Sequence, residues 1–142
     1  MPTMKFTVPG DPMGKPRMTR ADKWKRRAPV LKYRSWADWA RLCVRSQVGA
    51  LPAAEKTILI TFRAYFTPPE SWSKKRREAA IGQMKRTKPD GDNCLKMLDC
   101  FYAEDSALGD LHVIRRFDWE ARLEVEIEYE GESVANALAI AA

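Results

Sequence analysis

The stretch that decides the fold is residues 57–67, Thr-Ile-Leu-Ile-Thr-Phe-Arg-Ala-Tyr-Phe-Thr. Branched and aromatic side chains fill nearly every position, which favours a β-strand. Side chains of a strand alternate between its two faces, and here both faces are apolar. We therefore expect this strand to lie inside a sheet and to end at Pro68-Pro69.

Three further strands are expected around this one. Residues 5–8 alternate and stop at Pro9-Gly10, while residues 111–118 and 122–130 are expected to pair as a hairpin. In 122–130, apolar residues alternate with four glutamates, which predicts one buried face and one face in water.

Helices are expected between these strands. Ser35 is a candidate N-cap for a helix ending near Gly49, with Trp36 and Trp39 in its buried stripe. Ser73 is a candidate cap for a short basic helix over 74–80. A third helix is expected over 92–102, burying the stripe Leu95, Leu98, Phe101 and Tyr102.

The resulting order is β-α-β-α-α-β-β. It predicts a single α+β domain with a mixed sheet of about four strands and helices packed mainly on one face. We assign residues 1–132 to this domain, with 15–34 as a basic loop or arm, and 133–142 to a flexible tail.

Composition excludes several classes of protein. The 142 residues contain no apolar run near the ~20 residues that span a bilayer, and the N-terminus has no apolar signal segment. Three cysteines without a CxxC pair argue against a disulfide scaffold and favour a reducing cytoplasm. His112 is the only histidine, so catalysis would depend on carboxylates, lysines or hydroxyls.

The charge is divided between the two parts of the chain. Residues 1–89 hold 21 basic and 6 acidic side chains, whereas residues 90–142 hold 4 basic and 13 acidic ones. A basic half on so small a protein favours a polyanion partner, most often nucleic acid. The glutamates of 122–130 would repel DNA, so their face should point away from it.

The segment 88–96, Lys-Pro-Asp-Gly-Asp-Asn-Cys-Leu-Lys, carries the candidate chemistry. Asp90 and Asp92 are two apart, so an extended chain points both carboxylates the same way. Two such charges need a cation, and oxygen ligands without histidine suit Mg²⁺, with Mn²⁺ as the alternative. Lys96 follows one helical turn later, and Asp110 can join if the helix folds back on the sheet.

Each of these residues also has an ordinary structural interpretation. Asp92 could simply cap the helix, Lys96 could pair with Asp92 across one turn, and Asp99 could be a surface charge. The basic patch over 74–88 lies directly before the acids, which favours a metal-dependent phosphodiesterase that draws in a polyanion.

Residues 88–99 resemble the signature of the RusA family of Holliday junction resolvases, which is common in phages and prophages. The family pattern is Pro-Asp-x-Asp-Asn-Leu-x-Lys, followed by a helix ending in Asp-Ala-Leu. Two other segments, 8–17 and 71–77, are similar to the family's opening and to its basic segment. The chain departs from the pattern at Cys94, at the spacing to Asp99, and at Gly109, where the family has an acid.

The resemblance implies a homodimeric, Mg²⁺-dependent endonuclease that nicks four-way DNA junctions symmetrically. It maps the metal-binding acids onto Asp90, Asp92 and Asp110 and the catalytic lysine onto Lys96. Asn93 and Asp99 are second-tier candidates. The residues expected to hold DNA phosphates are Lys15, Arg17, Arg20, Lys74, Lys75, Arg76, Arg77 and Lys88.

Two rival functions remain open on the sequence. One is a non-catalytic branched-DNA-binding module that has lost its metal site, for which the departure at Gly109 would be the sign. The other is a nuclease of the same chemistry that acts on flaps or forks.

Overall fold

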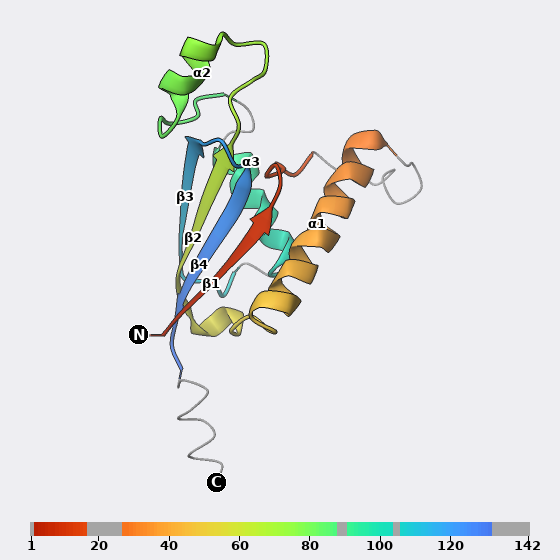
Figure 1. Ribbon diagram of the computed structural model, residues 1–142. Helices are drawn as coiled ribbons and strands as arrows, with labels where there is room; N and C mark the ends of the chain where they lie inside the picture. The colour runs from red at the N-terminus through yellow and green to blue at the C-terminus, as the bar shows by residue number, and fades with distance from the viewer. Residues whose placement is uncertain (1, 17–26, 88–90, 104–105, 132–142) are drawn as a thin grey trace.

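The computed structural model describes residues 2–16, 27–87, 91–103 and 106–131, without the side chains of residues 92 and 93. Its strands are β1 (Thr3–Pro9), β2 (Thr57–Phe66), β3 (Asp110–Phe117) and β4 (Arg122–Tyr129). Its helices are α1 (Ala28–Gln47), α2 (Lys74–Ala80) and α3 (Gly91–Leu95), with short 3₁₀ helices η2 (Ala54–Lys56) and η3 (Lys96–Cys100). The predicted α+β class and element order are confirmed (Figure 1).

The four strands form one mixed sheet in the order β1-β4-β2-β3. β2 lies inside the sheet, as its apolar faces predicted. The expected hairpin is wrong, because β3 pairs in parallel with β2, while β4 lies antiparallel between β1 and β2. The interior position of β4 follows from its apolar side chains, since Leu123, Val125 and Ile127 are at most 2% exposed. β3 is only half-buried, as an edge strand allows.

The core lies between this sheet and a layer made by α1, α3 and η3. Even-numbered residues of β2, such as Ile60 and Phe62, meet odd-numbered residues of β4 in the core. All three cysteines are free and buried. No helix in the described ranges is long and apolar enough to cross a membrane.

Helix α1 begins seven residues earlier than predicted, at Ala28 rather than at Ser35. Pro29 occupies the first turn, where its missing N–H costs no hydrogen bond and its φ suits a helix. Residues 28–34 are therefore helical and not part of a loop; residues 17–26 of the expected arm, and the tail 133–142, lie outside the described residues. Trp36 is buried as predicted, whereas Trp39 is 44% exposed and its Nε1 donates to the Pro9 carbonyl.

The third helix is shorter than predicted. It is α-helical only over Gly91–Leu95 and continues as the 3₁₀ helix η3. A 3₁₀ helix has 3.0 residues per turn instead of 3.6, so the buried stripe rotates from Lys96 onward. Cys94, Met97, Leu98 and Cys100 are buried, and Leu95, Phe101 and Tyr102 pack only partly against the core.

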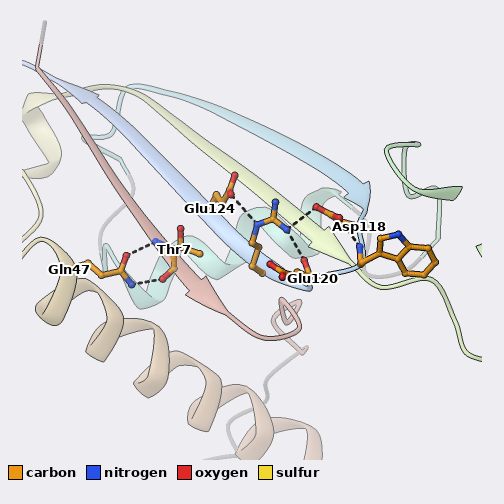
Figure 2. Close-up of polar contacts among 7 residues, drawn as sticks. Thr7, Gln47, Asp118, Glu120 and Glu124 are labelled. Atoms are coloured by element: carbon orange, nitrogen blue, oxygen red, sulfur yellow. Dashed lines mark hydrogen bonds and ion pairs between the residues drawn. The ribbon is translucent and has the colours of Figure 1, made fainter. Parts of the chain in front are cut away.

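Polar contacts hold the edge strand β1 and the beginning of the interior strand β4 to neighbouring parts of the chain. On β1, the Gln47 side chain accepts from the Thr7 N–H at 2.8 Å and donates to the Thr7 carbonyl at 2.6 Å (Figure 2). At the β3–β4 connection, Arg122 donates to Asp118 and Glu124 and lies 4.0 Å from the centre of the Tyr65 ring. These contacts fix the ends of β1 and β4 against the rest of the sheet.

Candidate active site

The candidate site lies at one end of the parallel pair β2 and β3. Figure 1 shows α2 and the beginning of α3 at the end where both strand arrows point. In open sheets that contain parallel strands, ligands bind outside the carboxyl ends of those strands. The connection from β2 to β3 therefore carries both the basic helix and the acidic motif to this edge.

The segment before the motif is fastened to β3. The Lys85 N–H donates to the Arg115 carbonyl at 3.2 Å, and isolated bridges join Ile81 to Phe117 and Met84 to Arg116. The Arg115 guanidinium donates through Nη1 to the Thr87 carbonyl at 3.1 Å. The chain thus reaches residue 88 from a fixed position on the sheet edge.

Lys85 is a buried cation at this position, only 8% exposed. Its Nζ donates to Thr87 Oγ1 at 2.6 Å and lies over the rings of Phe66 and Phe117. Burial lowers the pKa of Lys85 below its usual range, and the positive charge of Arg115 acts in the same direction. Two basic side chains, Lys85 and Arg115, therefore lie together beside the start of α3.

The motif residues are placed as follows. Lys88 and Asp90 lie outside the described residues, and so do the side chains of Asp92 and Asn93, although their backbone belongs to α3. Gly91 opens α3 beside Arg115, since a Cβ at Gly91 would lie 3.9 Å from Arg115 Nε. The α3 helix leads to Lys96, which is exposed at the start of η3.

The structure does not bring Asp110 to this end of β3. Asp110 opens the strand and pairs with Leu59, whereas Arg115 pairs with Ala64. Five residues of strand separate them, about 16 Å at ~3.3 Å per residue. Alternation also gives the two residues opposite faces, with Arg115 on the face covered by helices and Asp110 on the other. The assignment of Asp110 to the metal site therefore depends on the family pattern.

Asp99 belongs to η3, and its side chain contacts α1 and the N-terminal segment. It accepts a hydrogen bond from Tyr33 Oη at 2.5 Å and forms an ion pair with Lys15. Burial and the neighbouring Asp99 carboxylate raise the pKa of Tyr33. Lys15, one of the expected phosphate contacts, is therefore engaged with Asp99, which joins the N-terminal segment to the core.

The basic helix α2 presents cations beside the candidate site. The predicted Ser73 cap is confirmed, because its hydroxyl accepts from the Arg76 N–H at 3.2 Å. Lys74, Lys75 and Arg76 are exposed, and the Arg76 guanidinium lies 3.8 Å from the centre of the Trp72 ring. Arg77 is half-buried near Trp119. Arg17 and Arg20 lie outside the described residues.

The donor chemistry of the motif suits a hard divalent ion. Mg²⁺ binds proteins through one or two carboxylates, completed by water and substrate phosphate oxygens. Among the side chains that the structure describes, no three of His, Cys, Asp and Glu lie together. The side chains of Asp90 and Asp92, which the sequence analysis assigns to such an ion, lie outside the described residues.

Sequence reasoning missed Arg115, Thr87 and the buried position of Lys85. Arg115 and Arg116 are adjacent in a strand, which is an ordinary pattern for an edge strand exposed to water. The one usable signal was the alternation of side chains along a strand. A strand that places Val113 and Phe117 toward the core also places Arg115 on the face covered by helices. The sequence could not show that Thr87 and Gly91 lie beside Arg115, because they come 24 or more residues earlier and their approach depends on the parallel pairing of β2 and β3.

The comparison with family models agrees with this arrangement. The model for endodeoxyribonuclease RusA matches residues 9–128, most of the 142-residue chain. The match includes every strand, at least in part, and the whole of the connection that carries α2 and α3. No curated protein matched the chain. The chain belongs to the RusA family of endodeoxyribonucleases.

Proposed function

We propose that this protein is a divalent-metal-dependent endodeoxyribonuclease that resolves four-way (Holliday) DNA junctions by paired, symmetric nicks. The observation that carries the proposal is the family match over a chain whose acidic motif follows a basic helix at one end of the sheet. Recombination and repair of DNA, in a phage or prophage, is the setting that we infer from the family resemblance.

Asp90 and Asp92 would hold the ion, which we propose to be Mg²⁺ with Mn²⁺ as a substitute. When bound, such an ion polarises a phosphate and lowers the pKa of a water molecule. Asp110 is proposed as a third acid from the family pattern, because its place at the other end of β3 does not by itself support this role. Asn93 and Asp99 stay second-tier, and the contacts of Asp99 support a structural role.

The protein's own residues would divide the remaining work. The exposed cations Lys74, Lys75 and Arg76 of α2 would bind phosphates near the cut, together with Arg77 and the other proposed phosphate contacts, Lys15, Arg17, Arg20 and Lys88. Lys96 would stabilise negative charge that grows on the phosphate as the transition state forms. A two-fold symmetric homodimer would present two such sites to the two strands that are cut.

The test is cleavage of a synthetic four-way junction, with a fork, a flap and a linear duplex as comparison substrates. We expect paired nicks on the junction with Mg²⁺, no cleavage with EDTA, and little cleavage of linear duplex. Asp90→Asn, Asp92→Asn and Asp110→Asn should each abolish cleavage and keep junction binding, because each change removes a ligand charge at nearly constant shape. The matched control is Asp38→Asn, which should cleave normally, because Asp38 is an exposed α1 residue that pairs with Arg41.

Each outcome has a distinct meaning. Junction binding without metal-dependent cleavage would favour the non-catalytic module, and faster cleavage of forks or flaps would favour the other nuclease class. Full activity of Asp110→Asn alone would remove that residue from the metal site and leave Asp90 and Asp92 in place. Gel filtration and light scattering of the protein test the homodimer.

A further inference from the structure

An exposed tryptophan lies at the same end of the sheet as the basic helix α2. Trp119 belongs to the connection between β3 and β4 and is 51% exposed. The Arg77 guanidinium of α2 lies over its ring, with Cζ 5.7 Å from the ring centre. Arg77 Nε is buried and has no hydrogen-bond partner among the described residues, so the contact with the indole helps to place this side chain. The structure thus presents an open aromatic surface next to a cation.

The connection that carries Trp119 is fixed to the sheet. The Asp118 carboxylate accepts from the Trp119 N–H at 2.7 Å and from Arg122 Nη1 at 2.9 Å (Figure 2). The Asp118 N–H donates to the Phe66 carbonyl at 2.9 Å, and Arg122 also donates to the Glu120 carbonyl at 2.8 Å. The backbone of Trp119 is therefore held in place although its side chain is exposed, which limits the conformational entropy lost when a ligand binds.

Helix α2 is attached to the sheet next to this connection. Trp72, just before α2, packs against Phe117 with ring centres 5.6 Å apart, and the Arg76 guanidinium lies 3.8 Å from the centre of the Trp72 ring. After the helix, the Gly82 N–H donates to the Phe117 carbonyl at 2.8 Å. Phe117 ends β3, two residues before Trp119. The exposed cations of α2, which we propose to bind phosphates, and Trp119 thus lie at the same end of the sheet.

Resting on the proposed function, we propose that Trp119 stacks on a base at the branch point of the DNA and so favours branched DNA over linear duplex. Phosphate contacts are alike on every duplex arm and carry no information about branching. Inside a continuous duplex, each base pair covers the faces of its neighbours. At a branch point this stacking is interrupted, so that faces of the terminal base pairs become available. Every base has such a face, so stacking on an aromatic side chain tolerates any sequence, and a neighbouring arginine strengthens it.

Three substitutions separate stacking from apolar bulk. Trp119→Phe keeps an aromatic ring, Trp119→Leu keeps apolar volume without a ring, and Trp119→Ala removes both. For the leucine and alanine variants we expect junction affinity in EDTA weaker by about fivefold or more, the lower end of the loss for one stacked base. The phenylalanine variant should bind the junction within about threefold of the unaltered protein. Affinity for a linear duplex of the same arm sequence should change by less than about twofold in all three.

Two further measurements locate the contact. A fluorescent adenine analogue, which stacking quenches, is placed either at the branch point or in the middle of an arm. In the bound junction, emission from the branch-point label should be higher with Trp119→Ala than with the unaltered protein, and emission from the arm label should be equal. Because stacking releases no counterions, the slope of log K against log salt should stay the same in Trp119→Leu, whereas a lost phosphate contact would reduce its magnitude.

The matched control is Trp39→Leu. Trp39 is a tryptophan of similar exposure, 44%, on α1, and its Nε1 donates to the Pro9 carbonyl. This variant should bind junction and duplex as the unaltered protein does. Melting temperatures of all variants show whether they are folded at the temperature of the titration, and replacement of an exposed side chain such as Trp119 is compatible with an intact core.

Several results would overturn the inference. Unchanged junction affinity of Trp119→Ala would do so directly, and so would normal binding by Trp119→Leu, because apolar bulk would then suffice. An equal loss on junction and duplex would make Trp119 a general DNA contact. Conversion of a dimer to a monomer by Trp119→Ala, seen in gel filtration, would make it a subunit contact. These results leave the proposed nuclease standing, whereas an unaltered protein that binds the junction no better than the duplex would overturn the proposed junction preference and this inference together.

Discussion

Lys96 is the residue for which a catalytic role and a structural role predict different measurements. It is exposed at the start of η3, four residues after Asp92. If it meets charge that develops only in the transition state, Lys96→Ala should slow single-turnover cleavage by about 10²–10³-fold. Junction affinity should hardly change, because many other cations dominate binding of the ground state.

The comparison for this prediction is Lys56→Ala. Lys56 is an exposed lysine directly before β2, at the end of that strand away from α2, and its backbone N–H and carbonyl bond to Ala53 and Glu130. That variant should cleave at the normal rate. A Lys96→Ala rate within about threefold of the unaltered protein would leave Lys96 as a helical partner of Asp92, an interaction worth about 0.2–0.5 kcal/mol.

For single residues, the sequence indicates candidates that are neighbours in the chain, but it does not show contacts between residues far apart in the chain. The Asp90–Asp92 spacing and the place of Lys96 could be proposed from the sequence because these residues are close together in the chain, and their roles stay a prediction. Arg115 could not, because its contact with Thr87 depends on which edge of the sheet β3 occupies. The sequence offered Asp99 as a surface charge or a second-tier site residue, whereas in η3 it has Tyr33 and Lys15 as partners, both distant in the chain.

At the scale of elements, Gly109, directly before β3, lies against the backbone at the beginning of β2. A Cβ at Gly109 would lie 2.3 Å from the Ile58 carbonyl oxygen and 2.6 Å from that of Thr57, and the Gly109 N–H donates to Thr57 Oγ1 at 3.0 Å. Backbone atoms cannot move aside as a side chain can. Gly109→Ala should therefore destabilise the fold by about 1–3 kcal/mol, the usual cost of forced overpacking, as measured by urea unfolding.

Gly91→Ala is the control for this prediction. The nearest atom to its new Cβ is at the far end of a side chain, Arg115 Nε at 3.9 Å, an ordinary contact. Its stability should equal or slightly exceed that of the unaltered protein, since alanine favours a helix over glycine. Equal stability of both variants would mean that β2 and the start of β3 are not so closely packed.

The same close approach bears on the departure from the family pattern. Where the family has an acid, this chain has Gly109, and the space beside it is taken by the backbone of Thr57 and Ile58. A side chain at this position would have to displace β2. The sequence shows that an acid is absent at position 109. The lack of space for a side chain there became visible only with the parallel pairing of β2 and β3.

Element prediction succeeded where the cause was local. Ser73 caps α2 as expected, and the breadth of apolar character in 57–67 placed β2 inside the sheet. The hairpin of β3 and β4 was wrong because nearness in sequence does not decide which strand inserts between two others. The start of α1 was missed because residues 28–34 were assigned to the basic loop or arm, although Pro29 suits a first helical turn.

For the whole molecule, the division of charge predicts a steep salt dependence. Each neutralised phosphate contributes about −0.9 to the slope of log K against log salt. With basic residues concentrated in 15–34 and 74–88, we expect a junction-binding slope steeper than about −4. The double variant Lys74→Ala/Lys75→Ala should reduce the magnitude of the slope by about 2 for each subunit that binds, measured by fluorescence anisotropy in EDTA.

The control for this measurement is a variant on the face of the sheet that the helices do not cover. Arg63→Lys keeps its charge and its place opposite Glu126, so its slope should not change. A flat salt response of the unaltered protein would mean that the basic half serves another partner, and it would remove the electrostatic support for the nuclease proposal.

The strand order also determines when the sheet can form during synthesis. β4 is last of the four in the sequence, yet it supplies the only pairing partner of β1 within the described residues and one of the two partners of β2. A nascent chain that has reached β3 can align β3 with β2, but β1, which can already contact α1 through Thr7 and Gln47, has no partner strand until residue 129 has emerged. Ribosome-bound intermediates should thus hold a loosely attached N-terminal strand, and the sheet becomes continuous only in a late step.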